Sequence, residues 1–530
     1  MKTIRKSGLF LLLYFVVLSC QSKKSNSVGS IEDSKETNYT ADHTFDTVIL
    51  GGRVIDPETE LDAIRNLGLV NGKVALITEE KIQGKQSIDA TGLVVSPGFI
   101  DLHAHGQNIS AYRMQAVQGV TTALELESGL LPISDWYETQ ATKKLPIHYG
   151  AAVGWTYARI ATFQNNSPEA TAAYFQKAQS DNSWKDEIAS PEQLSKIMKL
   201  VEEGLEQGGL GIGINGGYAP GYGRKEYFEL AKLAKKHEVS TYTHVRYSSI
   251  PEPQSTFEAF EELLALAALT QARMHICHIN SNSLKDIDAC LELYEMAKKN
   301  GLPVTCGAYP WGAASTVIGA AMFDGADWKE RMGYDETAFQ VGEKRLDADS
   351  FKKIRTEAPG TFVSYHQLDE TKAEELAMLD KSITHPDILV ESDAMPWYTQ
   401  EGQAYEGNAW PIPNNLVAHP RSSGTFAKIL GSYVRDRKLL TMSDAIRKMS
   451  LMPAQTLEDF VPQMKNKGRI QAGMDADIVI FDPKTIAAVG TYAEPYHPAI
   501  GVKHLLVMGQ TVVSNGELQL DAAPGKPIRR

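Results

Sequence analysis

Short apolar runs alternate with amphipathic stretches from Pro97 onward. Runs of this length, separated by stretches with helical periodicity, are typical of strands that alternate with helices. The predicted helices include residues 190–208, where Ser190 is the expected N-cap before Pro191, and residues 225–237. A further apolar segment, "GTFVSYH" at residues 360–366, does not fit the strand count. The eight predicted strands are Gly98–His105, Val120–Glu127, Ile147–Trp155, Leu210–Asn215, Ser240–Val245, Arg273–Ile279, Pro303–Tyr309 and Ile388–Asp393.

This alternation predicts an α/β fold. Repeated strand–helix units favour a parallel sheet, which is either open or closed into a barrel. Eight such strands fit a (β/α)8, or TIM-like, barrel. Shorter β-rich runs, broken by Gly-Gly and Asn-Gly, lie at residues 46–56 and 68–78, and similar runs follow Gly468. We expect the C-terminal runs to complete a small sheet that begins near Asp46.

The first residues have the pattern of an export signal. Lys2, Arg5 and Lys6 precede an apolar run at residues 8–18, and "VLSC" ends at Cys20. This arrangement resembles a bacterial lipoprotein signal, with a plain secretory signal as the alternative. We expect residues 1–19 to be the signal peptide, Cys20 to carry lipid, and residues 20–45 to form a flexible tether. The protein is then exported across the inner membrane and lipid-anchored in a bacterial cell envelope.

Composition narrows the classes of partner. The 530 residues are 43% hydrophobic and 22% charged, as in ordinary globular proteins, and the formal net charge is -12. An acidic chain of this kind argues against a nucleic-acid partner. The cysteines other than Cys20 are odd in number and lie in apolar segments, so we expect Cys277, Cys290 and Cys306 to be buried thiols.

Polar residues that could hold a metal ion follow several of the predicted strands. Carboxyl ends of barrel strands meet at one face, and imidazole and carboxylate groups suit zinc and related divalent ions. A bound ion would lower the pKa of its water to about 7 and supply hydroxide at neutral pH. One carboxylate, either Glu127 or Glu125, could bridge two ions, and Asp393 is the expected proton carrier. His275 is out of phase with the other candidates. The predicted ligands are His103, His105, Glu127, His244, His278 and Asp393.

Longer motifs resemble one family. "PGFIDLHAH" followed by later histidines and an aspartate resembles the amidohydrolase superfamily. The stretches "THVR", "GLGIGINGGYAPG", "SDAMPW", the segment from "AHPRSSG" to "MPAQTL", and "GRIQAGMDADIVIFDP" resemble its N-acyl-D-amino-acid deacylase (D-aminoacylase) branch, from about Phe45 to the end. The resemblance implies a metal-binding barrel at residues 98–460. It also implies a β-sandwich built from residues 46–97 and 461–530.

The resemblance also assigns individual residues. It places metal ligands at His103, His105, His244 and His278, and the catalytic acid–base at Asp393. It further implies that Tyr218 and Arg421 bind the substrate carboxylate.

The chain departs from the family pattern at two positions. Ser128 takes the place of the bridging cysteine, and we expect Glu127 to bridge instead. Asn280 takes the place of a substrate-binding lysine, and Arg246 or Arg421 could compensate for the lost charge.

These observations predict a zinc-dependent enzyme with one or two ions that hydrolyses a non-peptide C–N bond. The expected substrate is an N-acyl (D-)amino acid or a related small amide, cleaved by metal-activated hydroxide. A cyclic amidase or a dipeptidase of the same superfamily is one alternative. A non-catalytic surface lipoprotein that binds metal or ligand is the other. The only expected membrane association is through the lipid anchor.

Overall fold

Eight parallel strands form the central sheet of the computed structural model, which describes residues 39–400 and 402–530. Neighbouring strands pair in chain order, and the two outer strands, β6 and β17, meet beyond their carboxyl ends. There the His105 N–H donates to the Ala394 carbonyl at 2.8 Å, and the Ala394 N–H donates to the His103 carbonyl at 3.3 Å. The predicted barrel is therefore confirmed. Its strands are β6 (Phe99–Asp101), β7 (Val120–Leu130), β8 (His148–Gly154), β9 (Ile212–Asn215), β10 (Ser240–His244), β11 (Arg273–Ile276), β12 (Val304–Ala308) and β17 (Ile388–Val390).

Most of these strands end earlier than the sequence predicts. β6 ends at Asp101 rather than His105, β11 at Ile276 rather than Ile279, and β17 at Val390 rather than Asp393. Beyond these points the backbone leaves the ladder, with only isolated bridges such as that between Ala104 and Ala394. The polar side chains that follow are thereby freed to turn into the barrel mouth.

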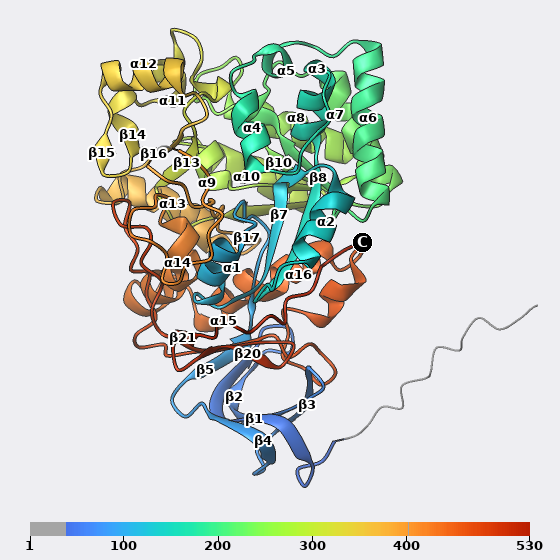
Figure 1. Ribbon diagram of the computed structural model, residues 1–530, viewed down its shortest axis with the longest axis vertical. Helices are drawn as coiled ribbons and strands as arrows, with labels where there is room; N and C mark the ends of the chain where they lie inside the picture. Colours follow the sequence, from blue (N-terminus) through green and yellow to red (C-terminus); the bar gives the residue numbers. More distant parts are fainter. Residues whose placement is uncertain (1–38, 401) are drawn as a thin grey trace, which may run out of the picture. The chain divides into compact units, whose positions relative to one another are not determined.

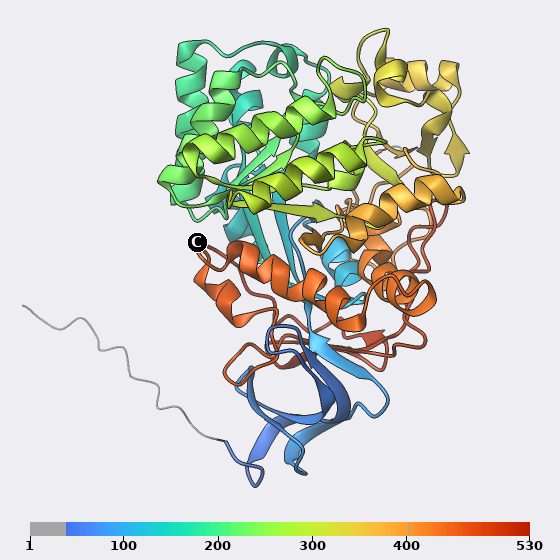
Figure 2. The ribbon, with the colours of Figure 1, turned by 180° about the vertical axis from the view of Figure 1, so that it is seen from behind.

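Helices cover the outside of the barrel, as Figure 1 and the reverse view in Figure 2 show. The predicted cap at Ser190 is confirmed, because its hydroxyl accepts from the Gln193 N–H while the Gln193 side chain accepts from the Ser190 N–H. The helices are α1 (Ile109–Ala116), α2 (Ile133–Ala141), α3 (Trp155–Phe163), α4 (Ala172–Ala178), α5 (Ser183–Asp186), α6 (Pro191–Glu206), α7 (Arg224–Lys236), α8 (Thr256–Thr270), α9 (Ile279–Asn282), α10 (Ile287–Lys299), α11 (Trp328–Met332), α12 (Ala348–Glu357), α13 (Ala373–Thr384), α14 (Arg421–Lys428), α15 (Met442–Ile446) and α16 (Met452–Leu457).

A separate antiparallel sheet is inserted between β12 and β17, shown in yellow in Figure 1. Its strands are β13 (Ala313–Val317), β14 (Phe339–Val341), β15 (Lys344–Arg345) and β16 (Phe362–His366). The segment that did not fit the barrel count is β16, which pairs with β13 and β14. The insertion has its own aromatic core, in which Phe339 packs against Phe323, Trp328 and Phe351.

Strands from both ends of the chain form a third sheet. The N-terminal strands are β1 (Thr44–Asp56), β2 (Leu61–Val70), β3 (Lys73–Thr78), β4 (Gln83–Asp89) and β5 (Val94–Pro97), and the C-terminal strands are β18 (Ile478–Phe481), β19 (Val502–Val507), β20 (Gln510–Ser514) and β21 (Glu517–Leu518). The two sets join where β5 pairs with β18, with Val95 opposite Ile480. The prediction that the tail completes the sheet begun near Asp46 is confirmed.

The predicted signal peptide, Cys20 and residues 20–38 of the predicted tether lie outside the described residues. Within the described ranges, none of the helices combines the length and apolar character required to cross a bilayer.

Candidate metal centre

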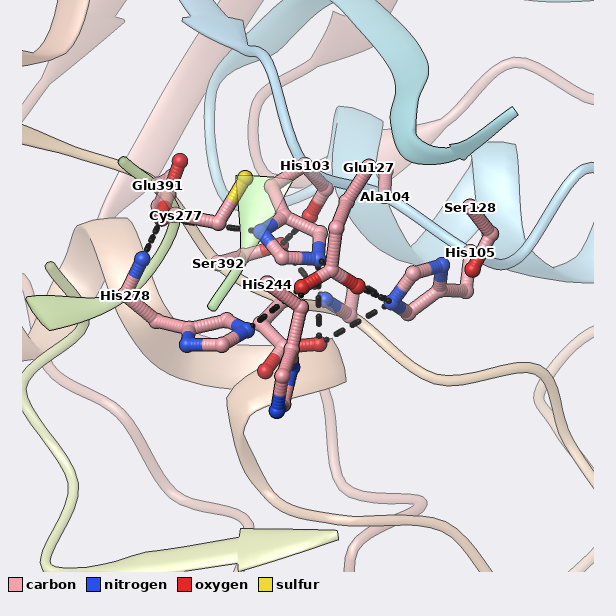
Figure 3. Close-up of polar contacts among 12 residues, drawn as sticks. His103, Ala104, His105, Glu127, Ser128, His244, Cys277, His278, Glu391 and Ser392 are labelled. Atoms are coloured by element: carbon pink, nitrogen blue, oxygen red, sulfur yellow. Dashed lines mark hydrogen bonds and ion pairs between the residues drawn. The ribbon is translucent and has the colours of Figure 1, made fainter. Parts of the chain in front are cut away.

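Four imidazoles converge on the carboxylate of Glu127 at the carboxyl ends of the barrel strands (Figure 3). The Oε1 atom of Glu127 lies 2.7 Å from His278 Nε2 and 3.2 Å from His244 Nδ1. Its Oε2 atom lies 3.2 Å from His103 Nε2 and 3.5 Å from His105 Nε2. Each oxygen therefore faces a different pair of histidines, which is the arrangement that a bridging carboxylate requires.

Asp393 completes one side of this cluster. Its Oδ1 atom lies 3.2 Å from His105 Nε2, 3.4 Å from His103 Nε2 and 2.8 Å from Arg421 Nη2. The six side chains that the sequence predicts as ligands come from the ends of five different strands, and they meet in the structure.

The donor set fits divalent zinc. Ligand atoms of Glu127, His244 and His278 all lie within 4.8 Å of one another, as do those of His103, His278 and Asp393. The Nε2 atoms of His103 and His105 are only 3.0 Å apart, and carboxylates face the Nδ1 atoms of both rings; with the ring protons on Nδ1, both Nε2 atoms are acceptors. Nitrogen and carboxylate oxygen are the ligands that zinc prefers, and the close approach of several acceptors suits a shared cation.

The electrostatics of the cluster also favour a bound cation. Burial acts to lower the pKa of His103, but the carboxylates of Glu127 and Asp393 raise it well above its usual value. Burial acts in the opposite sense on Glu127, yet His103 and His278 hold its pKa well below the usual range. Burial also acts to lower the pKa of His105, but Glu125 and Asp393 raise it well above its usual value, so without a metal these two imidazoles balance part of the buried negative charge with protons. A divalent cation takes the place of these protons when it binds.

Two of the converging residues have an unusual backbone. His278 has φ of 32° and Asp393 has φ of 52°, a left-handed conformation that is uncommon for residues with a side chain. Such conformations are concentrated at functional sites, where the surrounding structure maintains them.

The glycine pair before Tyr218 leaves room for one of the ligands, since a Cβ on Gly217 would lie 2.7 Å from the His244 ring.

Glu125 lies behind the cluster rather than at its centre. Its Oε2 atom is 2.9 Å from His105 Nδ1, and its Oε1 atom accepts from the Ser128 N–H at 3.2 Å. Between the two candidates for a bridge, the geometry therefore favours Glu127.

Two residues near the cluster were missed from the sequence. Glu391 is fully buried behind His103, and Cys277 lies on the same side of that ring (Figure 3). Burial raises the pKa of the Cys277 thiol well above its usual value. The one signal for Glu391 in the sequence is its place two residues before Asp393, although the strand ends at Val390 and Glu391 turns behind His103 (Figure 3).

A cavity of about 450 Å³ opens from the cluster. Asp393, Glu127 and His244 lie at its base, and part of its wall comes from the inserted sheet. Lys143 is the single lysine or arginine among the described residues that line it, whereas Asp135, Glu169 and Glu406 add negative charge. Its aromatic lining consists of Trp136, Tyr157, Phe175, Tyr218, Phe362, Tyr365 and Tyr398.

The four predicted substrate-binding residues do not all reach this cavity. Tyr218 lines it, with its hydroxyl 2.6 Å from Thr316 Oγ1. Arg421 is fully buried beside Asp393, and its Nε and Nη1 atoms have no hydrogen-bond partner among the described residues.

Arg246 and Asn280 are occupied elsewhere and do not line the cavity. The Arg246 guanidinium donates to Glu262 at 2.8 and 2.9 Å and lies over the Tyr222 ring. The Asn280 side-chain oxygen accepts from the Tyr309 N–H at 3.2 Å. Sequence reasoning could not foresee these partners, because Glu262 lies on α8, far from the strand ends.

Comparisons with known proteins identify relatives of this chain. The chain is 25% identical to the N-acyl-D-glutamate deacylase of Alcaligenes xylosoxydans xylosoxydans over 92% of this chain and 97% of that protein. It is 25% identical to the D-aminoacylase of the same organism, over 88% and 94% of the two chains. The crystal structure of N-acyl-D-glutamate deacylase from Bordetella bronchiseptica, complexed with zinc and a phosphonate inhibitor, shares the fold. It has a TM-score of 0.74 and 22% identity over 92% of this chain and 100% of that chain.

The amidohydrolase family model matches residues 86–513, which include the whole barrel and every residue of the metal cluster. The chain therefore belongs to the amidohydrolase family.

Proposed function

We propose that this protein is a zinc-dependent hydrolase that removes the acyl group from N-acyl-D-amino acids. The observation that carries the proposal is the Glu127 carboxylate, whose two oxygens face separate histidine pairs at the base of a substrate-sized cavity. Relatives named N-acyl-D-glutamate deacylase and D-aminoacylase, which match nearly full length, support the choice of substrate class.

Glu127, with His103 and His105 on one side and His244 and His278 on the other, would hold two zinc ions. Bound zinc polarises a carbonyl and makes water acidic enough to ionise near neutral pH. The Asp393 carboxylate accepts a proton from the attacking water and returns it to the leaving nitrogen. Burial acts to raise the pKa of Asp393, but Arg421 and His103 hold it below the usual value, so the carboxylate is ready to accept.

In this proposal Arg421 also binds the carboxylate of the substrate. Its Nη2 atom is committed to Asp393, but Nε and Nη1 are buried without partners, and buried donors without partners are costly. Arg421 is buried behind Asp393 and does not itself line the cavity, so the carboxylate of an N-acyl amino acid would satisfy these donors by binding against Asp393 at the cavity base. Because Asn280 offers no positive charge, Arg421 is the one guanidinium or ammonium group in contact with the described metal cluster.

The wall of the cavity indicates which side chains the substrate carries. An acidic side chain would find aromatic rings and further carboxylates, with Lys143 as the single cation lining this described cavity. Apolar groups gain free energy on leaving water for such a wall. The enzyme therefore prefers apolar D-amino acids, in contrast to the relative named for D-glutamate.

A substrate panel tests the proposal. Zinc-loaded full-length protein is assayed on the N-acetyl derivatives of D- and L-leucine, D-phenylalanine and D-glutamate, together with a hydantoin and dipeptides. We expect turnover of the apolar D-substrates, at least tenfold above D-glutamate. Preference for the hydantoin or the dipeptides would assign a cyclic amidase or a dipeptidase. Absence of turnover on every amide with zinc bound would leave only a binding protein.

We also propose that the enzyme is a lipoprotein of the bacterial cell envelope. The support is the sequence "VLSC" after a basic start and an apolar run, with Cys20 as the lipidated residue. Cells expressing the full chain in labelled palmitate should yield labelled protein in the membrane fraction, and the Cys20→Ala variant should not. Label on both proteins, or on neither, would contradict the proposal.

A further inference from the structure

Glu391 is a buried carboxylate that no step of the proposed reaction uses. It follows β17 directly, its exposed fraction is 0%, and it does not line the cavity. A carboxylate this deeply buried is costly unless other groups compensate its charge. Its surroundings therefore indicate what it does.

Three groups surround this carboxylate. The Oε1 atom accepts from the His278 N–H at 2.5 Å and lies 3.5 Å from His103 Nδ1, which has no hydrogen-bond partner among the described residues. The Oε2 atom lies 3.3 Å from His275 Nε2. Two of the three partners belong to predicted zinc ligands. The carboxylate thus contacts one ligand through its ring and another through its backbone.

His275 has a definite tautomer in this arrangement. An ionised carboxylate can only accept, so His275 Nε2 donates to Glu391. In the neutral ring, His275 Nδ1 then accepts from the Thr305 hydroxyl at 2.8 Å. The histidine that was out of phase with the predicted ligands is thereby a support for Glu391.

The chain also makes room for this carboxylate. A Cβ on Gly307 of β12 would lie 2.3 to 2.5 Å from the carboxyl carbon and both oxygens of Glu391. The backbone of Gly307 is not left-handed, so close approach, not conformation, explains glycine here.

We propose that Glu391 is a positioning residue that orients two zinc ligands. With a carboxylate facing Nδ1 of His103, the ring proton stays on that nitrogen and the Nε2 lone pair points toward the metal cluster. The same carboxylate holds the backbone of His278 at its left-handed φ of 32°. Glu125 has the matching position behind His105, so each histidine of the "HAH" pair has its own carboxylate. Such partners of metal-bound histidines typically raise metal affinity 10- to 100-fold.

The inference rests on the proposed zinc centre but not on its substrate. The test compares zinc affinity of the wild-type protein and Glu391→Gln by competition with a chromogenic chelator, without substrate. We expect a loss of about 10- to 100-fold, with an altered visible spectrum of the cobalt-substituted protein and with kcat largely restored by excess zinc. Zinc affinity within twofold of wild type would overturn the proposal.

A matched control separates positioning from general loss of a buried charge. Glu226 is 2% exposed and pairs with Arg159 at 2.7 Å, away from the metal cluster. Glu226→Gln should lower thermal stability while zinc affinity stays at the wild-type value. An equal loss of zinc affinity in both variants would also overturn the proposal.

Gly307→Ala provides a second variant if Glu391→Gln does not fold. The added methyl displaces the carboxylate but keeps its charge and the rest of the cluster. We expect zinc affinity to fall about tenfold, and unchanged affinity would contradict the role of Glu391. Inactivity of wild-type protein on every amide, with zinc affinity still dependent on Glu391, would refute the proposed function alone.

Discussion

The molecule contains two separate clusters of buried charged residues. One is the metal cluster, and the other, which we call the sheet cluster, consists of Lys467, Asp475, Asp477 and His148. In the sheet cluster every charge has a near partner: Lys467 Nζ lies 2.9 Å from Asp475 and 2.6 Å from Asp477. Asp477 also contacts His148 and accepts from the Met508 N–H. Asp475 has a second cation, because Lys73 Nζ lies 2.7 Å from its Oδ1 atom.

The metal cluster has no such balance. Four carboxylates contact at least one of its imidazoles, whereas Arg421 is its one permanent cation among the described residues. The carboxylates are those of Glu125, Glu127, Glu391 and Asp393. With neutral imidazoles, four carboxylates against one guanidinium leave three negative charges in the interior. The comparison teaches that a closed set of buried charges is structural. A set of buried groups with surplus negative charge that faces a cavity is instead suited to bind a cation.

Replacement of Asp393 gives the largest expected effect on function. In Asp393→Asn the proton carrier is lost, so kcat should fall about 10²- to 10⁴-fold while zinc remains bound. Steady-state kinetics and zinc analysis of the purified variant measure both quantities. The control is Asp477→Asn in the sheet cluster, which should retain kcat. Near wild-type kcat in Asp393→Asn would remove the functional distinction between the two clusters.

Replacement of Glu127 tests the bridge directly. Glu127→Gln keeps the size of the side chain but removes the charge that both histidine pairs share. We expect zinc content to fall from two ions per chain to one, measured by plasma emission on dialysed protein. Glu125→Gln is the comparison, and it should retain two ions with weaker binding. Two tightly bound ions in Glu127→Gln would show that the bridge lies elsewhere.

The sequence predicts the main elements of this site because they follow from periodicity. Parallel strands bring their carboxyl ends to one face, so polar residues such as His103, Glu127 and His244 had to meet there. Alternation along β7 indicated that both glutamates point inward, but it could not rank them. The family resemblance favoured Glu127, next to Ser128 in the place of the bridging cysteine, and the irregular pairing of β7 after Glu125 gives the two carboxylates their different positions.

Other features depend on contacts between distant segments. Arg246 was a candidate for the substrate, but α8 brings Glu262 to its guanidinium. Glu391 was overlooked because its role requires the space left by Gly307 on a neighbouring strand. The inserted sheet was visible only as one surplus apolar run, since its pairing of β13 with β16 spans more than forty residues.

Removal of the lysine from the sheet cluster should affect stability and leave the metal cluster intact. Lys467→Met keeps the length of the side chain but leaves Asp475 and Asp477 buried without their shared cation. Loss of one partner from a buried ion pair costs about 3–5 kcal/mol. Denaturant unfolding of wild type and variant measures this difference, with zinc content as the control. A loss of zinc together with stability would indicate that the two clusters are coupled.

The acid stability of the sheet cluster gives the smallest of these effects. Burial acts to raise the pKa of Asp477, but Lys467 and His148 hold it well below its usual value. A carboxyl group with a lowered pKa in the folded state stabilises the fold above its unfolded pKa of about 4, and this stabilisation is lost as the pH falls toward the folded pKa. The difference in unfolding free energy between wild type and Asp477→Asn should therefore be largest near pH 6. It should shrink by on the order of 2 kcal/mol as the pH is lowered toward 2. Urea unfolding of both zinc-free proteins across this pH range measures the change in this difference. A difference that does not vary with pH would mean that the Asp477 carboxyl group has the same pKa in the folded and the unfolded chain.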